Sequence, residues 1–203
     1  MIKTCFFDMG NVLMYFCHQT MCRNVAAVCG ISVHQATDLL LQRGLQWQLE
    51  RGEISEEEFH EGFQRETGNT FSIDDLRHAV ADIFHLNEPM VPLVDELKSA
   101  GIRLVLLSNT CVTHLNYIER NYDLLQRFDA LTTSFQAKAL KPHAAIYEAA
   151  LSMADAEPEE CFYTDDIEAY VVQARTYGIN AEVYTDTGKT RAALRSLGVA
   201  VSE

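Results

Sequence analysis

Short apolar runs alternate along the chain with longer stretches in which apolar residues recur at the spacing of a helix. Five apolar runs predict buried strands, at residues 4–7, 103–107, 130–133, 161–164 and 181–184. Amphipathic stretches predict helices at 92–100, 143–153, 167–177 and 190–197, and three of them are followed directly by a glycine. This alternation predicts an α/β fold, in which helices cover a doubly wound, Rossmann-like parallel sheet.

One long region breaks the alternation. Between residues 17 and 86 no run resembles a strand, and helical periodicity is interrupted by capping signals. Two serines have Gln or Glu three residues later, which is the spacing of a capping box: Ser32 with Gln35, and Ser55 with Glu58. We therefore expect four or five helices that form an all-helical cap at residues 16–86. Residues 1–15 and 87–203 would form the α/β core.

Composition narrows the functional classes. Hydrophobic residues make up 48% of the 203 residues and charged residues 22%, as in ordinary globular proteins. The net charge of −13 argues against a nucleic-acid partner, because neutralising phosphates requires a surplus of Lys and Arg. No apolar run approaches the roughly 20 residues of a membrane helix. The six cysteines contain no CxxC pair, and no signal peptide is visible. We expect a cytoplasmic protein with reduced thiols and no membrane contact.

The first chemical signal is an acidic residue at the end of a strand. Asp8 follows the apolar run 4–7 and is itself followed by the flexible Gly10. Ligands of open α/β sheets bind at the carboxyl ends of the strands. A carboxylate here marks a candidate site, although a simple strand-ending turn has the same sequence.

Three later segments place polar residues in equivalent positions. Ser108 and Asn109 offer hydroxyl, amide and backbone donors to an anion, or cap the helix that follows. Lys141 precedes a predicted helix and is either a cation of the site or a surface lysine. Asp165 and Asp166 suit the hard cation Mg²⁺, although adjacent aspartates are also common in turns.

The order of these four segments resembles the four motifs of the haloacid dehalogenase-like superfamily. Residues 7–13 are similar to the branch whose first motif reads F-D-x-G-N-V. Residues 134–147 resemble the third motif, S-x-x-x-G-x-x-K-P with a following I-Y pair, and residues 165–179 resemble the fourth, D-D with a helix ending in G-I. The resemblance covers essentially the whole chain, including a C1-type cap. Its pattern is closest to bacterial sugar-phosphate phosphatases such as the α-glucose-1-phosphate phosphatase.

The resemblance implies a phosphatase that acts on a small phosphorylated metabolite. Asp8 would be the catalytic nucleophile and would form an aspartyl-phosphate that water then hydrolyses. Lys141 would link the nucleophile to the transferring phosphoryl group. Ser108 and Asn109 would bind the phosphate oxygens together with Lys141.

The resemblance also implies Mg²⁺ as the cofactor. The metal ligands would be the Asp8 carboxylate, the Gly10 backbone carbonyl and Asp166. Asp165 would order water on the metal. A phosphate monoester dianion repels a carboxylate nucleophile, so positive charge at this place would be needed before attack.

Position 10 departs from the superfamily pattern. Most members carry a second Asp there, two residues after the nucleophile, as general acid and base, whereas this chain and the F-D-x-G-N-V branch have glycine. Such a group typically contributes ~10²–10⁴-fold to the rate. An anomeric phosphate, which is a good leaving group, would need less protonation. His18 is an alternative proton donor, or an ordinary residue at a helix start.

Three further residues affect the interpretation. Lys138 stands where the third motif has glycine, and is either a solvated loop residue or a source of positive potential. Tyr170 replaces an Asn that helps to position the fourth-motif loop, so metal affinity depends on how that loop is held. Trp47, in the predicted cap, is either a core anchor or a residue that faces the substrate.

Two other functions fit parts of the sequence. A haloacid dehalogenase would use Asp8 to attack carbon and would need no metal, so the presence of both Asp165 and Asp166 favours the phosphatase. A degenerate, non-catalytic binding protein would account for the departures from the motifs. The specific substrate and the oligomeric state are not predicted.

Overall fold

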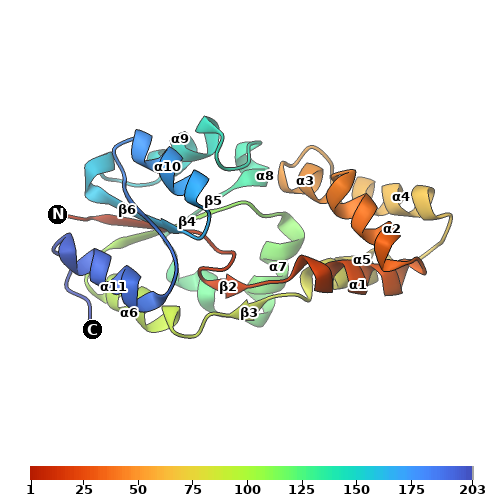
Figure 1. The fold of residues 1–203 in the computed structure, drawn as a ribbon, viewed down its shortest axis with the longest axis horizontal. Helices are drawn as coiled ribbons and strands as arrows, with labels where there is room; N and C mark the ends of the chain where they lie inside the picture. Colours follow the sequence, from red (N-terminus) through yellow and green to blue (C-terminus); the bar gives the residue numbers. More distant parts are fainter. Residues whose placement is uncertain (203) are drawn as a thin grey trace.

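A parallel sheet of five strands lies at the centre of the larger part of the molecule (Figure 1). The structure, a computed structural model, describes residues 1–202. The strands are β1 (Thr4–Phe7), β4 (Arg103–Ser108), β5 (Ala130–Thr133), β6 (Cys161–Asp165) and β7 (Asn180–Val183). Their order is β5-β4-β1-β6-β7, and all neighbours are parallel. Each strand begins and ends within one residue of its predicted range.

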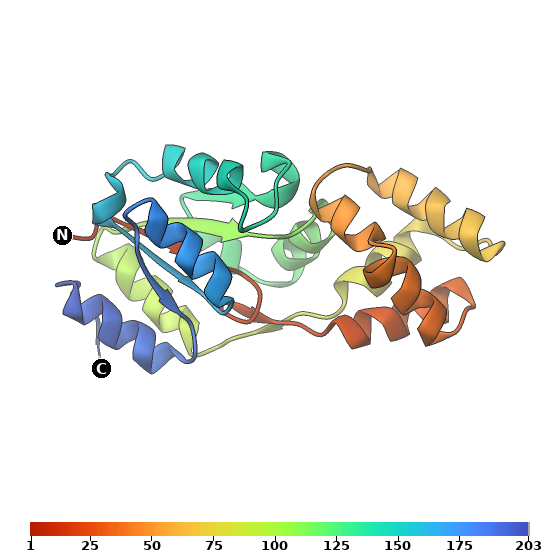
Figure 2. The same ribbon diagram turned by 45° about the horizontal axis from the view of Figure 1, so that its top comes forward.

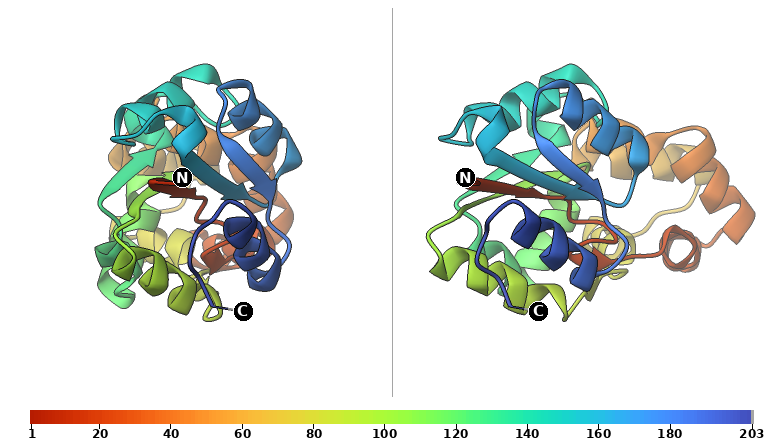
Figure 3. Two further views of the ribbon diagram at one scale, coloured as in Figure 1. Left: turned by 90° about the vertical axis from the view of Figure 1, so that its left-hand side faces the viewer. Right: turned by 60° about the vertical axis from the view of Figure 1, so that its left-hand side comes forward.

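Helices cover both faces of this sheet, as the end-on view in Figure 3 shows. One face carries α9 (Ala144–Ser152) and α10 (Glu168–Thr176), whose buried residues pack against Phe6 and Tyr163 of the sheet. The other face carries α6 (Met90–Ser99), α7 (Val112–Asn121) and α11 (Thr187–Ser196), which pack against Phe7 and Leu106. Successive strand residues point to opposite faces, so neighbouring apolar residues serve two separate cores. The predicted doubly wound α/β fold is confirmed.

The start of the last helix differs from its prediction. We expected this helix to begin at residue 190, whereas α11 begins at Thr187. The Asp186 side chain accepts a hydrogen bond from the Lys189 backbone N–H at 3.0 Å and caps the first turn. The apolar periodicity starts later than this cap, which explains why the prediction omitted the first turn of the helix.

Helices fill the region between β2 (Met14–Tyr15) and β3 (His85–Leu86), a short antiparallel pair. We call residues 18–81 the helical insert. It contains α1 (His18–Cys29), α2 (Val33–Thr37), a π-helical turn (Asp38–Gln42), α3 (Leu45–Glu50), α4 (Glu56–Thr67) and α5 (Ile73–Ala81). Both predicted capping boxes are present. Figures 1 and 2 show the insert beyond one end of the sheet, opposite the end at which both termini lie.

The strand order places the carboxyl ends of β1, β4 and β6 beside one another. The chain passes from β1 outward through β4 and β5, then returns to the other side of β1 with β6 and β7. The order therefore reverses at β1, and this is the point at which α/β sheets bind ligands. The helical insert lies beyond these same strand ends (Figure 1).

Two further structural features concern the cysteines and the length of the helices. All six cysteines are free, and five of them are buried. Within residues 1–202, no helix combines the length and the apolar character that crossing a bilayer requires.

Candidate active site

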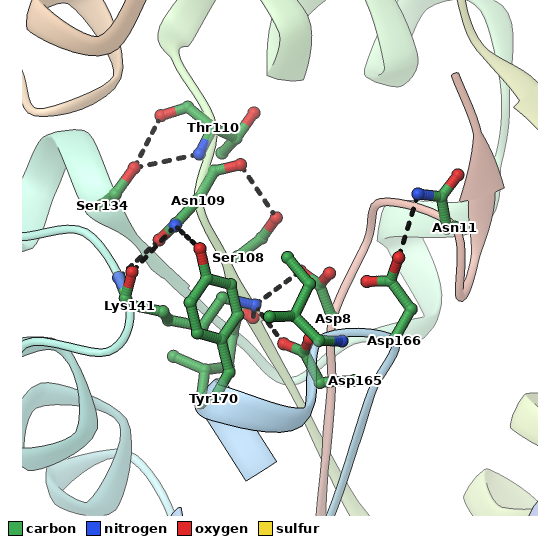
Figure 4. Close-up of polar contacts among 12 residues, drawn as sticks. Asp8, Asn11, Ser108, Asn109, Thr110, Ser134, Lys141, Asp165, Asp166 and Tyr170 are labelled. Carbon is green, nitrogen blue, oxygen red and sulfur yellow. Dashed lines mark hydrogen bonds and ion pairs between the residues drawn. The ribbon is translucent and has the colours of Figure 1, made fainter. Parts of the chain in front are cut away.

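Residues from four separate segments meet at the carboxyl edge of the sheet (Figure 4). Asp8 directly follows β1, and Asp165 is the last residue of β6, with Asp166 next to it. Asn109 follows β4, and Lys141 comes from the loop that leads into α9. The tertiary structure thus brings together side chains that are up to 158 positions apart in the sequence, from Asp8 to Asp166.

Lys141 occupies the centre of the cluster. Its Nζ atom lies 2.8 Å from Asp8 Oδ1 and 2.6 Å from Asp165 Oδ2, and it donates to the Leu107 carbonyl at 3.0 Å. The residue is only 2% exposed. A buried ammonium group needs such partners, because removal from water is costly without them. Lys141 is therefore a buried residue of the cluster, and the alternative of a surface lysine is wrong.

Asp165 is held by the protein through both carboxylate oxygens. One oxygen accepts from the Tyr163 hydroxyl as well as from Lys141, and the other accepts from the Ile167 backbone N–H at 2.8 Å. The side chain is completely buried. Asp165 therefore fixes the position of the Lys141 ammonium group beside Asp8.

Asp166 is more open to the site. It is half-buried, and its Oδ2 atom accepts from Asn11 Nδ2 at 3.0 Å. Asn11 has a φ of 53°, a left-handed conformation that Asn adopts more readily than most residues. This backbone conformation turns the Asn11 amide towards the fourth motif and orients one carboxylate oxygen of Asp166.

The three carboxylates fit a divalent cation. One oxygen each from Asp8, Asp165 and Asp166 can be chosen so that all lie within 4.8 Å of one another. Carboxylate oxygens are the ligands that Mg²⁺ prefers. When all three carboxylates are ionised, their negative charge exceeds the positive charge of the Lys141 ammonium group by two. A bound divalent cation would neutralise that excess.

Burial perturbs the protonation of the cluster. It raises the pKa of Asp8 to about 7; the nearby Lys141 ammonium lowers this pKa, and the Asp165 carboxylate raises it. Burial acts to lower the pKa of Lys141, but Asp8 and Asp165 outweigh it, so the Lys141 pKa is raised. Lys141 stays charged, whereas Asp8 needs further positive charge to be fully ionised at neutral pH.

Ser108 and Asn109 differ in their access to the site. Asn109 lines the cavity, and its Oδ1 accepts from the Lys141 backbone N–H at 2.7 Å. Ser108 is buried, and its hydroxyl donates to the Asn109 carbonyl at 3.4 Å. Ser108 is not among the residues that line the cavity.

A cavity of about 370 Å³ opens above the cluster, between the sheet edge and the helical insert. Its floor includes Asp8, Lys141 and Asp166, and the insert contributes Trp47 and Glu50. Its volume lies within the range of pockets that bind small molecules. Trp47 is half-buried and lines this cavity, and its indole N–H donates to the Leu41 carbonyl of the insert at 3.1 Å.

Comparison with known proteins assigns the family. The sequence model of the haloacid dehalogenase-like hydrolases matches residues 2–174, most of the chain. This chain belongs to that family.

Solved structures of family members have the same fold. A predicted HAD-like family hydrolase from Porphyromonas gingivalis is 25% identical, with a TM-score of 0.82 and coverage of 99% of this chain and 100% of that one. The HAD family enzyme bt-2542 from Bacteroides thetaiotaomicron, in complex with magnesium and inorganic phosphate, is 22% identical, with a TM-score of 0.83 and coverage of 94% and 99%. An L-2-haloacid dehalogenase from Xanthobacter autotrophicus is 19% identical, with a TM-score of 0.64 and coverage of 100% and 85%.

Two of the departures from the family motifs, Lys138 and Tyr170, have structural explanations. Lys138 has a φ of 54°, the left-handed conformation that favours glycine, and its Nζ donates to the Gly52 carbonyl of the helical insert at 2.7 Å. The Tyr170 ring lies over the site, with its centroid 5.2 Å from Lys141 Nζ and its hydroxyl 3.4 Å from Asn109 Nδ2. Lys138 therefore joins the insert to the core, and Tyr170 packs on Lys141.

Three residues of the site were not identified from the sequence. Tyr163 lies in an apolar strand, and only the fold shows that its hydroxyl reaches Asp165. Glu50 ends a helix, a position normally exposed, and only the packing of the insert buries it. Asn11 could have been identified, because the family motif itself contains this Asn.

Proposed function

We propose that this hydrolase is a Mg²⁺-dependent phosphatase that hydrolyses a small phosphate monoester through an aspartyl-phosphate on Asp8. One observation carries the proposal: a buried lysine joins Asp8 to Asp165 beside a third carboxylate, under a cavity of metabolite size. The bt-2542 enzyme, crystallised with magnesium and inorganic phosphate, supports it. We further propose that residues 16–86 act as the cap over the substrate.

The residues of the cluster would divide the work of phosphoryl transfer. Bound Mg²⁺, held by Asp8, the Gly10 carbonyl and Asp166, would offset the repulsion between the ester dianion and the carboxylates. An Asp8 oxygen would attack phosphorus, and the Lys141 ammonium group, 2.8 Å from Asp8, would stabilise the charge on the phosphoryl oxygens. Asn109 would donate its amide to those oxygens. Asp165 would keep Lys141 in place.

The rival reaction, attack of Asp8 on a carbon–halogen bond, uses fewer of these features. A metal-free displacement has no need for an acidic cluster whose charge exceeds that of Lys141 by two. Asp166 would be a disadvantage there, because Asn11 holds its carboxylate towards the site and an anionic haloacid would be repelled. The acidic cluster therefore favours the phosphatase.

A substrate screen tests the proposal. Purified protein is incubated with a panel of phosphate esters, including sugar phosphates and an aryl phosphate, with Mg²⁺ or with EDTA, and phosphate release is measured. We expect turnover with Mg²⁺ only. Asp8→Asn should lower it by at least ~10³-fold, as for loss of a catalytic nucleophile. Asp75→Asn removes an equal charge from an exposed position of the helical insert and should leave turnover unchanged.

Two outcomes contradict the proposal. Halide release from 2-haloacids in EDTA would identify a dehalogenase. Binding of phosphate esters without turnover of any of them would identify a non-catalytic member of the family.

A further inference from the structure

The site has no carboxylate at the position where most family members hold their acid and base. Residue 10 is glycine, and the space beside it is filled. A methyl group added at Gly10 would lie 2.7 Å from Cε1 of Phe16, well inside van der Waals contact. The Phe16 ring packs in turn against Phe84 and His18. A side chain that protonates the leaving group would therefore have to lie on another wall of the cavity.

A further carboxylic acid lines the cavity, and it comes from the helical insert. Glu50, the last residue of α3, lines the same cavity as Asp8 and Lys141 and is only 6% exposed. Its Oε1 atom accepts from Gln46 Nε2 at 3.0 Å. Within residues 1–202, no cation pairs with this carboxylate, and Gln46 is the one side chain bonded to it. Its second oxygen is free to meet a ligand.

The core holds Glu50 in this position through the backbone. The Glu50 carbonyl accepts from the Ser134 hydroxyl at 2.6 Å, and Ser134 also accepts from the Thr110 N–H at 2.9 Å. Two residues further on, the Gly52 carbonyl accepts from Lys138. Ser134 and Lys138 both belong to the third motif segment, which also carries Lys141. The end of α3 is thus attached to the same loop as the catalytic lysine.

We propose that Glu50 is the general acid and base of this enzyme, supplied by the helical insert in place of the missing carboxylate at position 10. This inference rests on the phosphatase function proposed above. Attack by Asp8 must come from the sheet side of the phosphorus atom, so the leaving oxygen departs towards the insert, where Glu50 lies. The structure therefore places the acid on the side at which the proton is needed.

The proton balance of both steps follows. In the first step the Asp8–phosphorus bond forms, the bond from phosphorus to the ester oxygen breaks, and the Glu50 carboxylic acid gives its proton to that oxygen, releasing the alcohol. In the second step the Glu50 carboxylate takes a proton from water as the water oxygen attacks phosphorus. The bond to Asp8 breaks, phosphate leaves, and both residues return to their starting state.

Protonation of Glu50 near neutral pH supports this role. Burial raises its pKa to about 7; the Gln46 hydrogen bond lowers it, and the Asp8 charge raises it. Burial lowers the pKa of His114 to about 4 and also lowers that of His18, so at pH 7 both imidazoles are mainly neutral and are weaker acids than a carboxylic acid. The titratable or charged groups around Glu50 are Asp8, His18, Arg51, Cys111, His114, Lys141, Asp166 and Tyr170.

The dependence on leaving group tests the proposal. Wild type and Glu50→Gln are compared, with saturating Mg²⁺, on phosphate monoesters whose leaving groups range from activated phenols to simple alcohols. We expect kcat/KM of Glu50→Gln to fall ~10²–10⁴-fold for alkyl esters and less than about tenfold for the most activated aryl ester. The aryl ester should also give a burst of one phenol per enzyme, because the second step still needs the base. The basic limb of the alkyl-ester pH profile, near pH 7, should disappear.

A matched control changes another polar side chain of the same cavity. His18→Gln should change kcat/KM by one common factor for all of the esters. If Glu50→Gln also lowers kcat/KM by one factor for every ester, with the pH profile unchanged, Glu50 only packs or binds hydroxyl groups and the proposal is overturned. If Glu50→Gln fails to fold, Glu50→Asp gives the same test, with an intermediate leaving-group dependence expected. Absence of turnover in the wild type would instead overturn the phosphatase function itself.

Discussion

Replacing Asp8 by Asn is expected to stabilise the metal-free protein, although it removes the nucleophile. Burial raises the pKa of Asp8 to about 7, whereas an unfolded Asp titrates near ~3.9. Between these values the folded state retains a proton that the unfolded state has lost. The free energy of unfolding therefore falls as the pH rises from about 4 to about 7. Above pH 7 Asp8 is ionised in both states, and the full cost of its buried charge is present.

The size of this effect follows from the difference between the two pKa values. About three pKa units at roughly 1.4 kcal/mol each give about 4 kcal/mol, and relaxation around the charge reduces this to about 2–4 kcal/mol. Urea unfolding in EDTA measures it. At pH 8, Asp8→Asn should be more stable than wild type by about 2–4 kcal/mol, and at pH 5 by only about 1–1.5 kcal/mol. Mg²⁺ at pH 8 should stabilise the wild type more than the variant.

An exposed residue provides the control for this comparison. Asp75→Asn makes the same chemical change on the surface of α5 and should stay within about 0.5 kcal/mol of wild type at both pH values. A variant at position 8 that is no more stable than wild type at pH 8 would refute the reasoning. A stability difference that does not change with pH would also refute the reasoning, because the loss of a packing contact does not depend on protonation.

Two further predictions concern the metal and position 10. Asp166→Asn should raise the Mg²⁺ concentration for half-maximal phosphate release at least about tenfold, because it removes a ligand charge; an unchanged Mg²⁺ titration would exclude Asp166 as a ligand. Gly10→Asp should not raise kcat/KM for alkyl phosphates, because the Phe16 ring occupies the space that the new side chain needs. The double variant Gly10→Asp with Phe16→Ala should have a higher kcat/KM for these esters than Gly10→Asp alone. If Gly10→Asp alone is more active than wild type, the Phe16 ring can move aside at little energetic cost.

The sequence predicted the strands closely because their signals are local. Strands β1, β4 and β6 consist mainly of a continuous apolar run that a polar residue ends or follows, and a strand buried on both faces has this pattern wherever it lies in the sheet. The capping boxes at Ser32 and Ser55 were predicted for the same reason, since donor and acceptor lie within one turn. The predicted element boundaries were wrong where a single contact, rather than a periodic apolar pattern, sets the boundary. The Asp186 cap and the two-residue pair of β2 with β3 are examples.

The layered α/β fold and the order of four motifs, from Asp8 to Asp166, could be predicted from the amino-acid sequence, because apolar periodicity and motif spacing are properties of the chain alone. Three features became visible only in the folded molecule: Lys141 is buried between Asp8 and Asp165, Phe16 fills the space beside Gly10, and Glu50 lines the cavity. These facts depend on contacts between segments far apart in sequence. Burial, and with it the pKa of each carboxyl group, exists only once those segments have packed together.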